Sequence, residues 1–372
     1  MRKVAVIFGG NSCENEISVL TGVFVINVLD GTKYTVIPVY IHTDGGMYTA
    51  ENMRELSTFR DRRYSKFERV FFDGGILYAL RGFKKIKSLG KIDAAINCCH
   101  GGLGEGGGVS ALMEWNGIAL ASPGVLPSAV FMDKCVTKKM LRALHIPTVD
   151  YLCINETDFI KRGAFMIKSV ETRLKYPVVV KPSKLGSSIG IAVARNEQQL
   201  KTALQTAFTL DTQALVERYL EDKKDVNCAV CSLRGEVCVA EPEESFGVGV
   251  YTFEEKYVKR TKDTRDAGRY ALNEDVAHRI KAYAKSVYKR TGMAGVVRMD
   301  FLLSGEDVYL CEVNTVPGSL AYYFFCERVS EAKTFFGDLI EEALSTAKAE
   351  RKRIITTGIL QNVAQPKKLR GE

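Results

Sequence analysis

Residues 296–314 read VVRMDFLLSGEDVYLCEVN, and this stretch decides the fold. Two runs rich in β-branched and aromatic residues flank the polar SGED, a pattern typical of an antiparallel hairpin. Successive side chains of a strand alternate between its faces, so Arg298 shares a face with Asp300, and Glu312 shares one with Asn314. A turn centred in SGED places residue 299 opposite 312 or 313, so Asp300 lies close to Glu312 and Arg298 close to Asn314. The hairpin is therefore predicted to gather four polar side chains on one face.

This polar face predicts a site for a metal ion and phosphate. The carboxylates of Asp300 and Glu312 and the amide of Asn314 supply the hard oxygen ligands that suit Mg²⁺ bridging nucleotide phosphates. Arg298 would add positive charge where an oxyanion develops. The alternative is an exposed hairpin with a charged outer face. The run NTVPG (314–318) that follows favours a shaped loop over a plain strand end.

Residues 176–193, YPVVVKPSKLGSSIGIAV, predict a strand, a loop of small residues and a second strand. Small side chains let backbone N–H groups approach phosphate closely, and Lys181 adds a point charge at the end of the first strand. The spacing differs from that of a Walker loop. A plain hairpin turn is the alternative.

The first third of the chain alternates strand and helix patterns, which predicts a parallel α/β domain with ligands at the carboxyl ends of its strands. The other two thirds carry further strands and helices, with a polar loop at 243–270. The predicted elements are strands 4–10, 34–42 and 94–102, a hairpin at 69–80, and helices 12–29, 109–117, 134–146 and 273–291; strands 228–232 and 236–240 complete the set.

Two glycine loops are expected at one end of the first sheet. The first, GGNSCE (9–14), follows the first strand, and the second, HGGLGEG (100–106), follows another. Glu14 lies three residues after Asn11, which fits either a helix capping box or substrate binding. His100 fits either a hydrogen-bonded loop histidine or a ligand to substrate. The dinucleotide fingerprint G-x-G-x-x-G is absent after the first strand.

The composition indicates a globular cytoplasmic protein. A length of 372 residues predicts two or three domains. No apolar run reaches the roughly 18–20 residues of a membrane helix, and the first residues do not resemble a signal peptide. The net charge of +8 is concentrated partly in the last 25 residues, and elsewhere basic residues lack the interleaved aromatics of a single-strand binder. We therefore expect no nucleic-acid or membrane partner.

The ten cysteines are scattered through apolar runs, as expected for buried thiols in a reduced compartment. Cys228 and Cys231 form a CxxC pair with Cys238 nearby. No second pair stands at ligand spacing, so a zinc site is not favoured.

Eight motifs together resemble the D-alanine–D-alanine ligases, a family of the ATP-grasp superfamily. The resemblance covers roughly residues 3–320 and rests on the order and approximate spacing of all eight. It implies an α/β (α+β ATP-grasp) fold, in which an N-terminal parallel α/β domain precedes two α+β subdomains that sandwich ATP. The motifs are FGGNSCENEIS, HGGLGEGG, MDK, VVVKPSKLGSSIG, VERYL, FEEKY, RMDF and EVNTVPG.

The resemblance also implies domain bounds. We expect an N-terminal substrate domain at 1–132, a central ATP-grasp subdomain at 133–221, and a C-terminal subdomain with the metal site at 222–350. The basic tail at 351–372 is expected to be poorly ordered. The polar loop at 243–270 is the candidate lid, because it holds Lys256 and Tyr257 and few apolar anchors.

The family resemblance assigns roles to matching positions. Glu14, Ser187, Tyr257 and Arg298 would be catalytic, with Arg298 steadying the tetrahedral intermediate and the other three tying the closing loop. Glu14 and His100 would lie near the first amino acid, and Gly318 and Tyr323 near the second. Asp300, Glu312 and Asn314 would bind two Mg²⁺ or Mn²⁺ ions. ATP would contact Lys134, Lys181, Ser188, Glu217, Tyr219, Leu220, Asp225 and Lys256.

Three departures from the family pattern concern mostly the second substrate. Gly106 replaces an acidic residue in the second glycine loop, and Asp266-Ala267-Gly268 replaces a prolyl-alanine turn. Tyr323 falls near the position of a serine that helps to bind the second carboxylate.

The expected function is ATP-dependent joining of two D-alanines through a D-alanyl phosphate, for peptidoglycan precursors that build the cell wall and maintain cell shape. The alternative is a related ligase that joins D-alanine or another amino acid to a different amine or hydroxy acid. A silent nucleotide-binding protein is disfavoured by the intact lysines and metal ligands. A homodimer is the family expectation.

Overall fold

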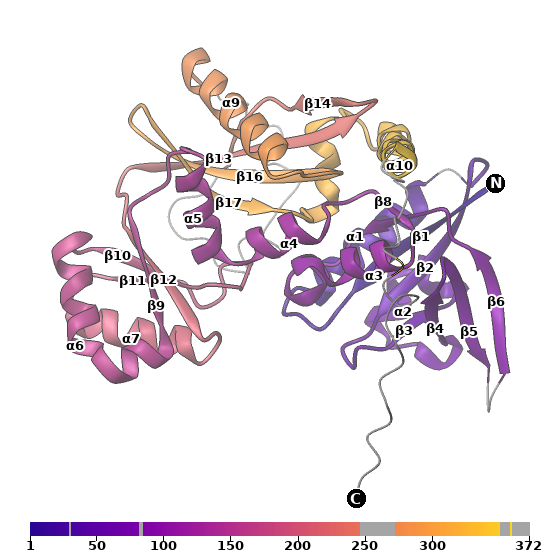
Figure 1. Ribbon diagram of the computed structural model, residues 1–372, viewed down its shortest axis with the longest axis horizontal. Coiled ribbons are helices and arrows are strands. Elements are labelled where there is room, and N and C mark those ends of the chain that lie inside the picture. The colour runs from indigo at the N-terminus through magenta and orange to yellow at the C-terminus, as the bar shows by residue number, and fades with distance from the viewer. Residues whose placement is uncertain (30, 82–84, 246–271, 350–357, 359–372) are drawn as a thin grey trace, which may run out of the picture.

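The computed structural model describes residues 1–29, 31–81, 85–245, 272–349 and 358. It contains three sheets, one of eight strands, one of four and one of five. Figure 1 shows the eight-stranded sheet in one lobe and the four-stranded sheet in another, with the five-stranded sheet above and between them. The predicted parallel α/β start followed by two α+β units is the observed architecture.

The N-terminal sheet has the order β6-β5-β4-β3-β2-β1-β7-β8. Only β2, β1, β7 and β8 are parallel; β3 to β6 extend the sheet as an antiparallel meander that includes the predicted hairpin. The strands are β1 (Arg2–Gly9), β2 (Tyr34–Ile41), β3 (Met47–Thr49), β4 (Glu68–Asp73), β5 (Ile76–Arg81), β6 (Lys85–Lys91), β7 (Ala94–Asn97) and β8 (Ala119–Leu120); the helices are α1 (Asn15–Val28), α2 (Leu56–Arg60), α3 (Val109–Trp115) and α4 (Val125–Met132).

Strand β1 is apolar on both faces because helices cover both. Val6 and Phe8 point into a core shared with α1, whereas Ala5 and Ile7 point into a second core shared with α3. This alternation explains the continuous apolar run VAVIF, which is typical of a buried parallel strand.

The central sheet is antiparallel, with the order β11-β10-β12-β9. Helices α6 and α7 pack on one face, and Cys135 of α5 packs against Leu215 on the other. The elements are α5 (Lys134–Ala143), β9 (Tyr151–Asn155), α6 (Glu156–Arg173), β10 (Val178–Pro182), β11 (Ala192–Ala194), α7 (Glu197–Phe208) and β12 (Gln213–Arg218).

The third sheet has the order β14-β13-β16-β17, with β15 paired to β13. Helix α9 covers one face, and α10 packs against the other. The elements are β13 (Lys223–Leu233), β14 (Glu236–Val239), β15 (Glu243–Ser245), α9 (Glu274–Arg290), β16 (Val296–Ser304), β17 (Asp307–Asn314) and α10 (Ala332–Ala349).

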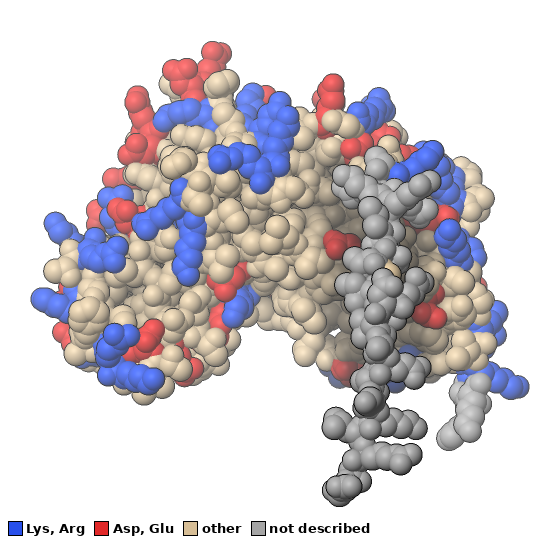
Figure 2. Space-filling view, in the orientation of Figure 1, with Lys and Arg blue, Asp and Glu red and all other residues tan. Residues whose placement is uncertain are grey.

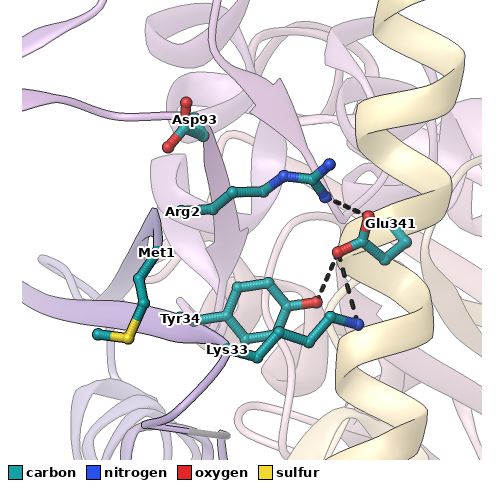
Figure 3. Close-up of a pocket in the computed structure, with 6 residues that line it drawn as sticks. All are labelled: Met1, Arg2, Lys33, Tyr34, Asp93 and Glu341. Atoms are coloured by element: carbon teal, nitrogen blue, oxygen red, sulfur yellow. Dashed lines mark hydrogen bonds and ion pairs between the residues drawn. The ribbon is translucent and has the colours of Figure 1, made fainter.

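Helix α10 joins the first and third sheets. Its Phe336 and Ile340 lie in the same core as Val6 of β1 and Cys231 of β13. At the amino ends of β1 and β2, Glu341 forms an ion pair with Arg2 and accepts a hydrogen bond from Tyr34 Oη at 2.8 Å. Lys33 Nζ lies 3.6 Å from the same carboxylate, and these residues line a cavity of about 740 Å³ (Figure 3).

No helix in the described part of the chain is long and apolar enough to cross a membrane. On the face drawn in Figure 2, Lys and Arg mix with Asp and Glu over both ends of the molecule instead of gathering in one patch.

Candidate active site

The predicted hairpin pairing is confirmed. Arg298 stands opposite Asn314 and Asp300 opposite Glu312, and a register shift follows Asp300. Arg298 donates to Asp300 from Nε and Nη2, at 2.7 and 2.8 Å, and Asn314 Nδ2 lies 3.0 Å from Asp300 Oδ2. Burial lowers the pKa of Arg298, but the Asp300 carboxylate and Tyr323 outweigh it and hold that pKa well above its usual value. The side chain is therefore a permanent cation beside the Asp300 carboxylate.

Two lysines of the central segment face this hairpin. Lys134 Nζ lies 2.7 Å from Glu312 Oε1. Lys181 forms an ion pair with Glu217, and its Nζ lies 3.7 Å from Cys311 Sγ on β17. Burial lowers the pKa of Lys181, but Cys311 and the Glu217 carboxylate raise it above its usual value. The structure thus brings the predicted phosphate-binding lysines to the acidic face of the hairpin.

A third lysine, Lys138, was missed by the sequence analysis. It is completely buried, and its Nζ lies 2.5 Å from Glu217 Oε1. Burial raises the pKa of Glu217, but Lys138 and Lys181 together lower it to about 2, so this carboxylate stays ionised. Lys138 stands one helical turn after Lys134, and this i, i+4 spacing was the signal available in the sequence.

The small-residue loop after β10 closes onto the first glycine loop. Ser187 Oγ donates a hydrogen bond to Glu14, which is buried. Ser187 and Ser188 both adopt left-handed backbone, with φ of 52° and 61°. A Cβ at Gly186 would lie 2.5 Å from Glu14 Oε2, so glycine is needed for this approach. The two loops enclose a cavity of about 410 Å³.

The capping-box hypothesis for Glu14 is wrong. Helix α1 begins at Asn15, and no side chain caps its first turn. With Asn11 as the N-cap the helix would begin at residue 12, but it begins three residues later, and the Glu14 carboxylate instead accepts a hydrogen bond from Ser187.

His100 is buried between two fixed partners. Its Nε2 lies 2.8 Å from Thr21 Oγ1, and its backbone N–H donates to Ser18 Oγ at 2.7 Å. Burial lowers the pKa of His100 to about 4, despite an opposing contribution from the Val316 backbone. The histidine is therefore neutral at pH 7. Its contact with Thr21 fits the predicted role of a hydrogen-bonded loop histidine.

Glu105 ties the second glycine loop to the loop after β17. It accepts hydrogen bonds from the Gly101 N–H at 2.8 Å and the Val316 N–H at 3.1 Å, and Thr315 Oγ1 donates at 3.3 Å. Burial, with the nearby Glu14 charge, raises the pKa of Glu105 to about 7.

The residues expected near adenine and ribose lie along the junction of the central and third sheets. Tyr219 and Leu220 follow β12 directly, and the Arg195 guanidinium carbon lies 5.9 Å from the Tyr219 ring. Asp225 lies on β13, with its carboxylate 2.5 Å from Lys223 Nζ.

Gly318 and Tyr323 lie in the loop that follows β17, beside Arg298. Lys256 and Tyr257, and with them most of the candidate lid, lie outside the described residues, as does the basic tail apart from Gly358.

Cys228 and Cys231 belong to opposite faces of β13 and pack in different cores, so they cannot share a metal ion. Within the described ranges, no group of three or more His, Cys, Asp or Glu side chains is placed to hold a metal.

The central antiparallel sheet and helix α5 present lysines to the acidic hairpin of a second antiparallel sheet, and this arrangement defines an ATP-grasp fold. Family models described as D-ala D-ala ligase N-terminus and C-terminus match residues 3–123 and 140–345. The chain belongs to the D-alanine–D-alanine ligase family and is an ATP-dependent ligase.

Individual relatives agree over nearly the whole chain. The D-alanine–D-alanine ligase of Thermosipho melanesiensis is 31% identical over 97% of this chain and 99% of its own. That of Thermosipho africanus is 32% identical over 87% and 88%. The solved ligase of Helicobacter pylori matches with a TM-score of 0.75 at 27% identity, over 95% of this chain and 100% of its own. The VanG D-Ala:D-Ser ligase of Enterococcus faecalis matches with a TM-score of 0.73 at 25% identity, over 92% and 99%.

Proposed function

We propose that this ligase joins two D-alanines through a D-alanyl phosphate, using ATP, and so supplies peptidoglycan precursors for the cell wall. The observation that carries the proposal is the convergence of Lys134 and Lys181 on the hairpin face of Arg298, Asp300 and Glu312. Cations that neutralise phosphate stand there beside carboxylates suited to a metal, which is the arrangement that phosphoryl transfer requires.

ATP would lie between the central and third sheets. Lys134, Lys181 and the loop at Ser188 would hold its phosphates, while Glu217, Tyr219, Leu220 and Asp225 would hold the nucleoside. Glu217 forms ion pairs with both the buried Lys138 and Lys181, and so fixes Lys181 in place. We extend this assignment to a substrate domain at 1–132, a central subdomain at 133–221 and a metal-binding subdomain at 222–350, each built around one sheet.

The donor set on the hairpin fits magnesium. Asp300 and Glu312 pair across the strands, and the Asn314 amide lies within hydrogen-bonding distance of Asp300. Two carboxylates and an amide oxygen are hard ligands, and nucleotide phosphate and water complete such sites. Two Mg²⁺ or Mn²⁺ ions bound here would neutralise charge on the transferring phosphoryl group.

The chain's own residues have separate tasks in the reaction. Glu14 and His100 would border the first D-alanine, whose carboxylate attacks the γ-phosphate of ATP to give an acyl phosphate. The amine of the second D-alanine then attacks the acyl carbon, and phosphate leaves. Arg298 would stabilise the oxyanion of that step. Ser187, with Tyr257 and Lys256 of the lid, would keep water from the acyl phosphate.

The acceptor side supports a second candidate function. Tyr323 stands beside Arg298, near the position of a serine in the family pattern, so the site around Gly318 differs from that pattern. A D-Ala:D-Ser ligase shares this fold at 25% identity. A ligase that joins D-alanine to another amino acid, a hydroxy acid or an amine is therefore the alternative.

We further propose a cytoplasmic homodimer whose partners are small amino-acid substrates, with no nucleic-acid or membrane partner. The mixed charges on the face in Figure 2 are consistent with that assignment.

One experiment separates the candidates. Purified protein is incubated with ATP, Mg²⁺ and pairs of D- and L-amino acids and hydroxy acids, and the products are identified by mass. D-Ala–D-Ala as the main product supports the proposal. ADP release with D-alanine only in the presence of a different acceptor supports the alternative, and no turnover with any pair contradicts both.

A further inference from the structure

The loop after β17 contains three consecutive residues with left-handed backbone. Ser319, Leu320 and Ala321 have φ of 50°, 51° and 47°. None is glycine, and left-handed backbone is unfavourable for residues with a Cβ. Such a run persists only where the surrounding structure holds it, and strained backbone of this kind concentrates at functional sites.

Two kinds of contact hold this loop. The side chains of Leu320 and Ala321 are buried in the core between α1 and α10. At the start of the run, the Ser319 N–H donates to Thr21 Oγ1 at 3.1 Å. Thr21 lies on α1 and is 1% exposed, so water cannot substitute for this contact.

The Thr21 hydroxyl also contacts His100, at 2.8 Å from Nε2. The same hydroxyl oxygen accepts the Ser319 N–H, so one buried side chain of α1 links the loop after β17 to the second glycine loop.

The backbone is held on both sides of Gly318. Glu105 accepts the Val316 N–H two residues before it, and the Thr21 hydroxyl accepts the Ser319 N–H directly after it. A small shift of that hydroxyl would move the backbone N–H of Gly318 relative to Arg298.

We propose that Thr21 is a positioning residue for the second substrate. The inference rests on the proposed function, in which Gly318 and Tyr323 face the acceptor. Thr21 acts through the loop and fixes where the acceptor amine meets the acyl phosphate. It has no part in forming that acyl phosphate.

Hydroxylamine distinguishes this role from a general structural one. It attacks the acyl carbon, phosphate leaves, and D-alanyl hydroxamate forms. Unlike the acceptor amino acid, hydroxylamine has no carboxylate for the 316–323 loop to bind. The wild type and the variants Thr21→Val, Thr21→Ala and Thr21→Ser are given ATP, Mg²⁺, D-alanine and hydroxylamine, and hydroxamate and dipeptide are measured together.

Thr21→Val leaves a buried N–H and a ring nitrogen unpaired, so we expect the acceptor KM to rise about tenfold while hydroxamate formation stays within about twofold. Thr21→Ser keeps the hydroxyl and should restore the wild-type product ratio. Thr21→Ala is smaller and cannot overpack the core, so it replaces Thr21→Val if the valine variant does not fold. We expect the same rise in acceptor KM for it.

The matched control is Thr58→Val. Thr58 is also 1% exposed, and its hydroxyl donates to the Asn52 carbonyl at 2.6 Å, outside the candidate site. This variant should keep the wild-type ratio. An unchanged ratio of dipeptide to hydroxamate in Thr21→Val or Thr21→Ala overturns the inference. So does a Thr21→Ser variant that is as defective as those two. Absence of both products in the wild type would instead overturn the proposed function.

Discussion

Lys134 and Glu312 form an ion pair of 2.7 Å that joins helix α5 to strand β17. The lysine comes from the central segment, and the carboxylate belongs to the hairpin that we assign to the metal. Binding of ATP with its metal must therefore change the surroundings of both groups. The pair is partly buried, which makes the loss of either partner costly.

Lys134→Ala should raise the KM for ATP by about tenfold or more, because a charge-assisted contact to phosphate is lost and Glu312 is left without its cation. The measurement is ADP release against ATP concentration. Lys139→Ala, an exposed lysine on the same helix, is the control and should behave as the wild type. Equal KM values for the two variants would remove Lys134 from the nucleotide site.

Arg298→Ala should retain ATP binding and lower kcat by roughly 100- to 1000-fold, as expected for loss of one oxyanion donor. Arg298→Lys keeps the charge without the two-point contact to Asp300, so it should recover only part of the rate. Binding is measured by calorimetry and kcat by ADP release. Arg279→Ala is the control, because Arg279 lies on α9 and donates to the Glu306 carbonyl at the turn of the hairpin. Near-normal turnover in Arg298→Ala would contradict the assigned role.

Ser187→Ala should raise the KM for D-alanine by about fivefold to tenfold, because the hydrogen bond from the small-residue loop after β10 to Glu14 is lost. The kinetics are followed at saturating ATP. Ser169→Ala is the control, since this hydroxyl donates only to a carbonyl of its own helix. An unchanged KM would mean that Glu14 holds its position without Ser187.

His100 should make the protein less stable in mild acid. Its pKa in the folded protein is about 4, below the ordinary value of 6.5, so folding favours the neutral ring. This contribution is complete above pH 6.5 and is lost as the pH falls toward 4, and about 2 kcal/mol of it should disappear between about pH 7 and pH 5. It is measured as the difference between the wild type and His100→Gln in urea unfolding at both pH values, because Glu105 changes the stability of both proteins over the same range.

His100→Gln should remove that pH-dependent loss, whereas the exposed His278→Gln should retain it. Glu105 contributes with the opposite sign, because its raised pKa favours the protonated form and costs stability as the pH rises from 4.5 to 7. A pH difference that is identical in the wild type and His100→Gln would show that His100 does not titrate in this range.

The hairpin at 296–314 could be predicted closely. Its short turn and alternating strands place Asp300 near Glu312 and Arg298 near Asn314, whereas the register shift after Asp300 was not visible in the sequence. The small-residue loop after β10 could also be predicted, because its run of small residues between two strand-like runs is visible in the sequence itself.

Other features depend on tertiary contacts that no local pattern contains. Lys138 pairs with Glu217 only because α5 packs on β12. Both partners of His100 lie on other segments, so its neutral state could not be deduced from its own loop. Glu14 was open to two interpretations until the start of α1 fixed its direction.

Helix α10 follows every other described element, yet it completes the core on one face of the first sheet. Strands β7 and β8 and helix α1 are not fully covered there until Phe336 and Ile340 arrive from the last part of the chain. On the ribosome, the opening lobe must therefore wait unfinished while residues 133–349 are made. Chains that stop before α10 should expose this surface and depend on chaperones, and separate expression of the opening lobe should yield aggregated protein.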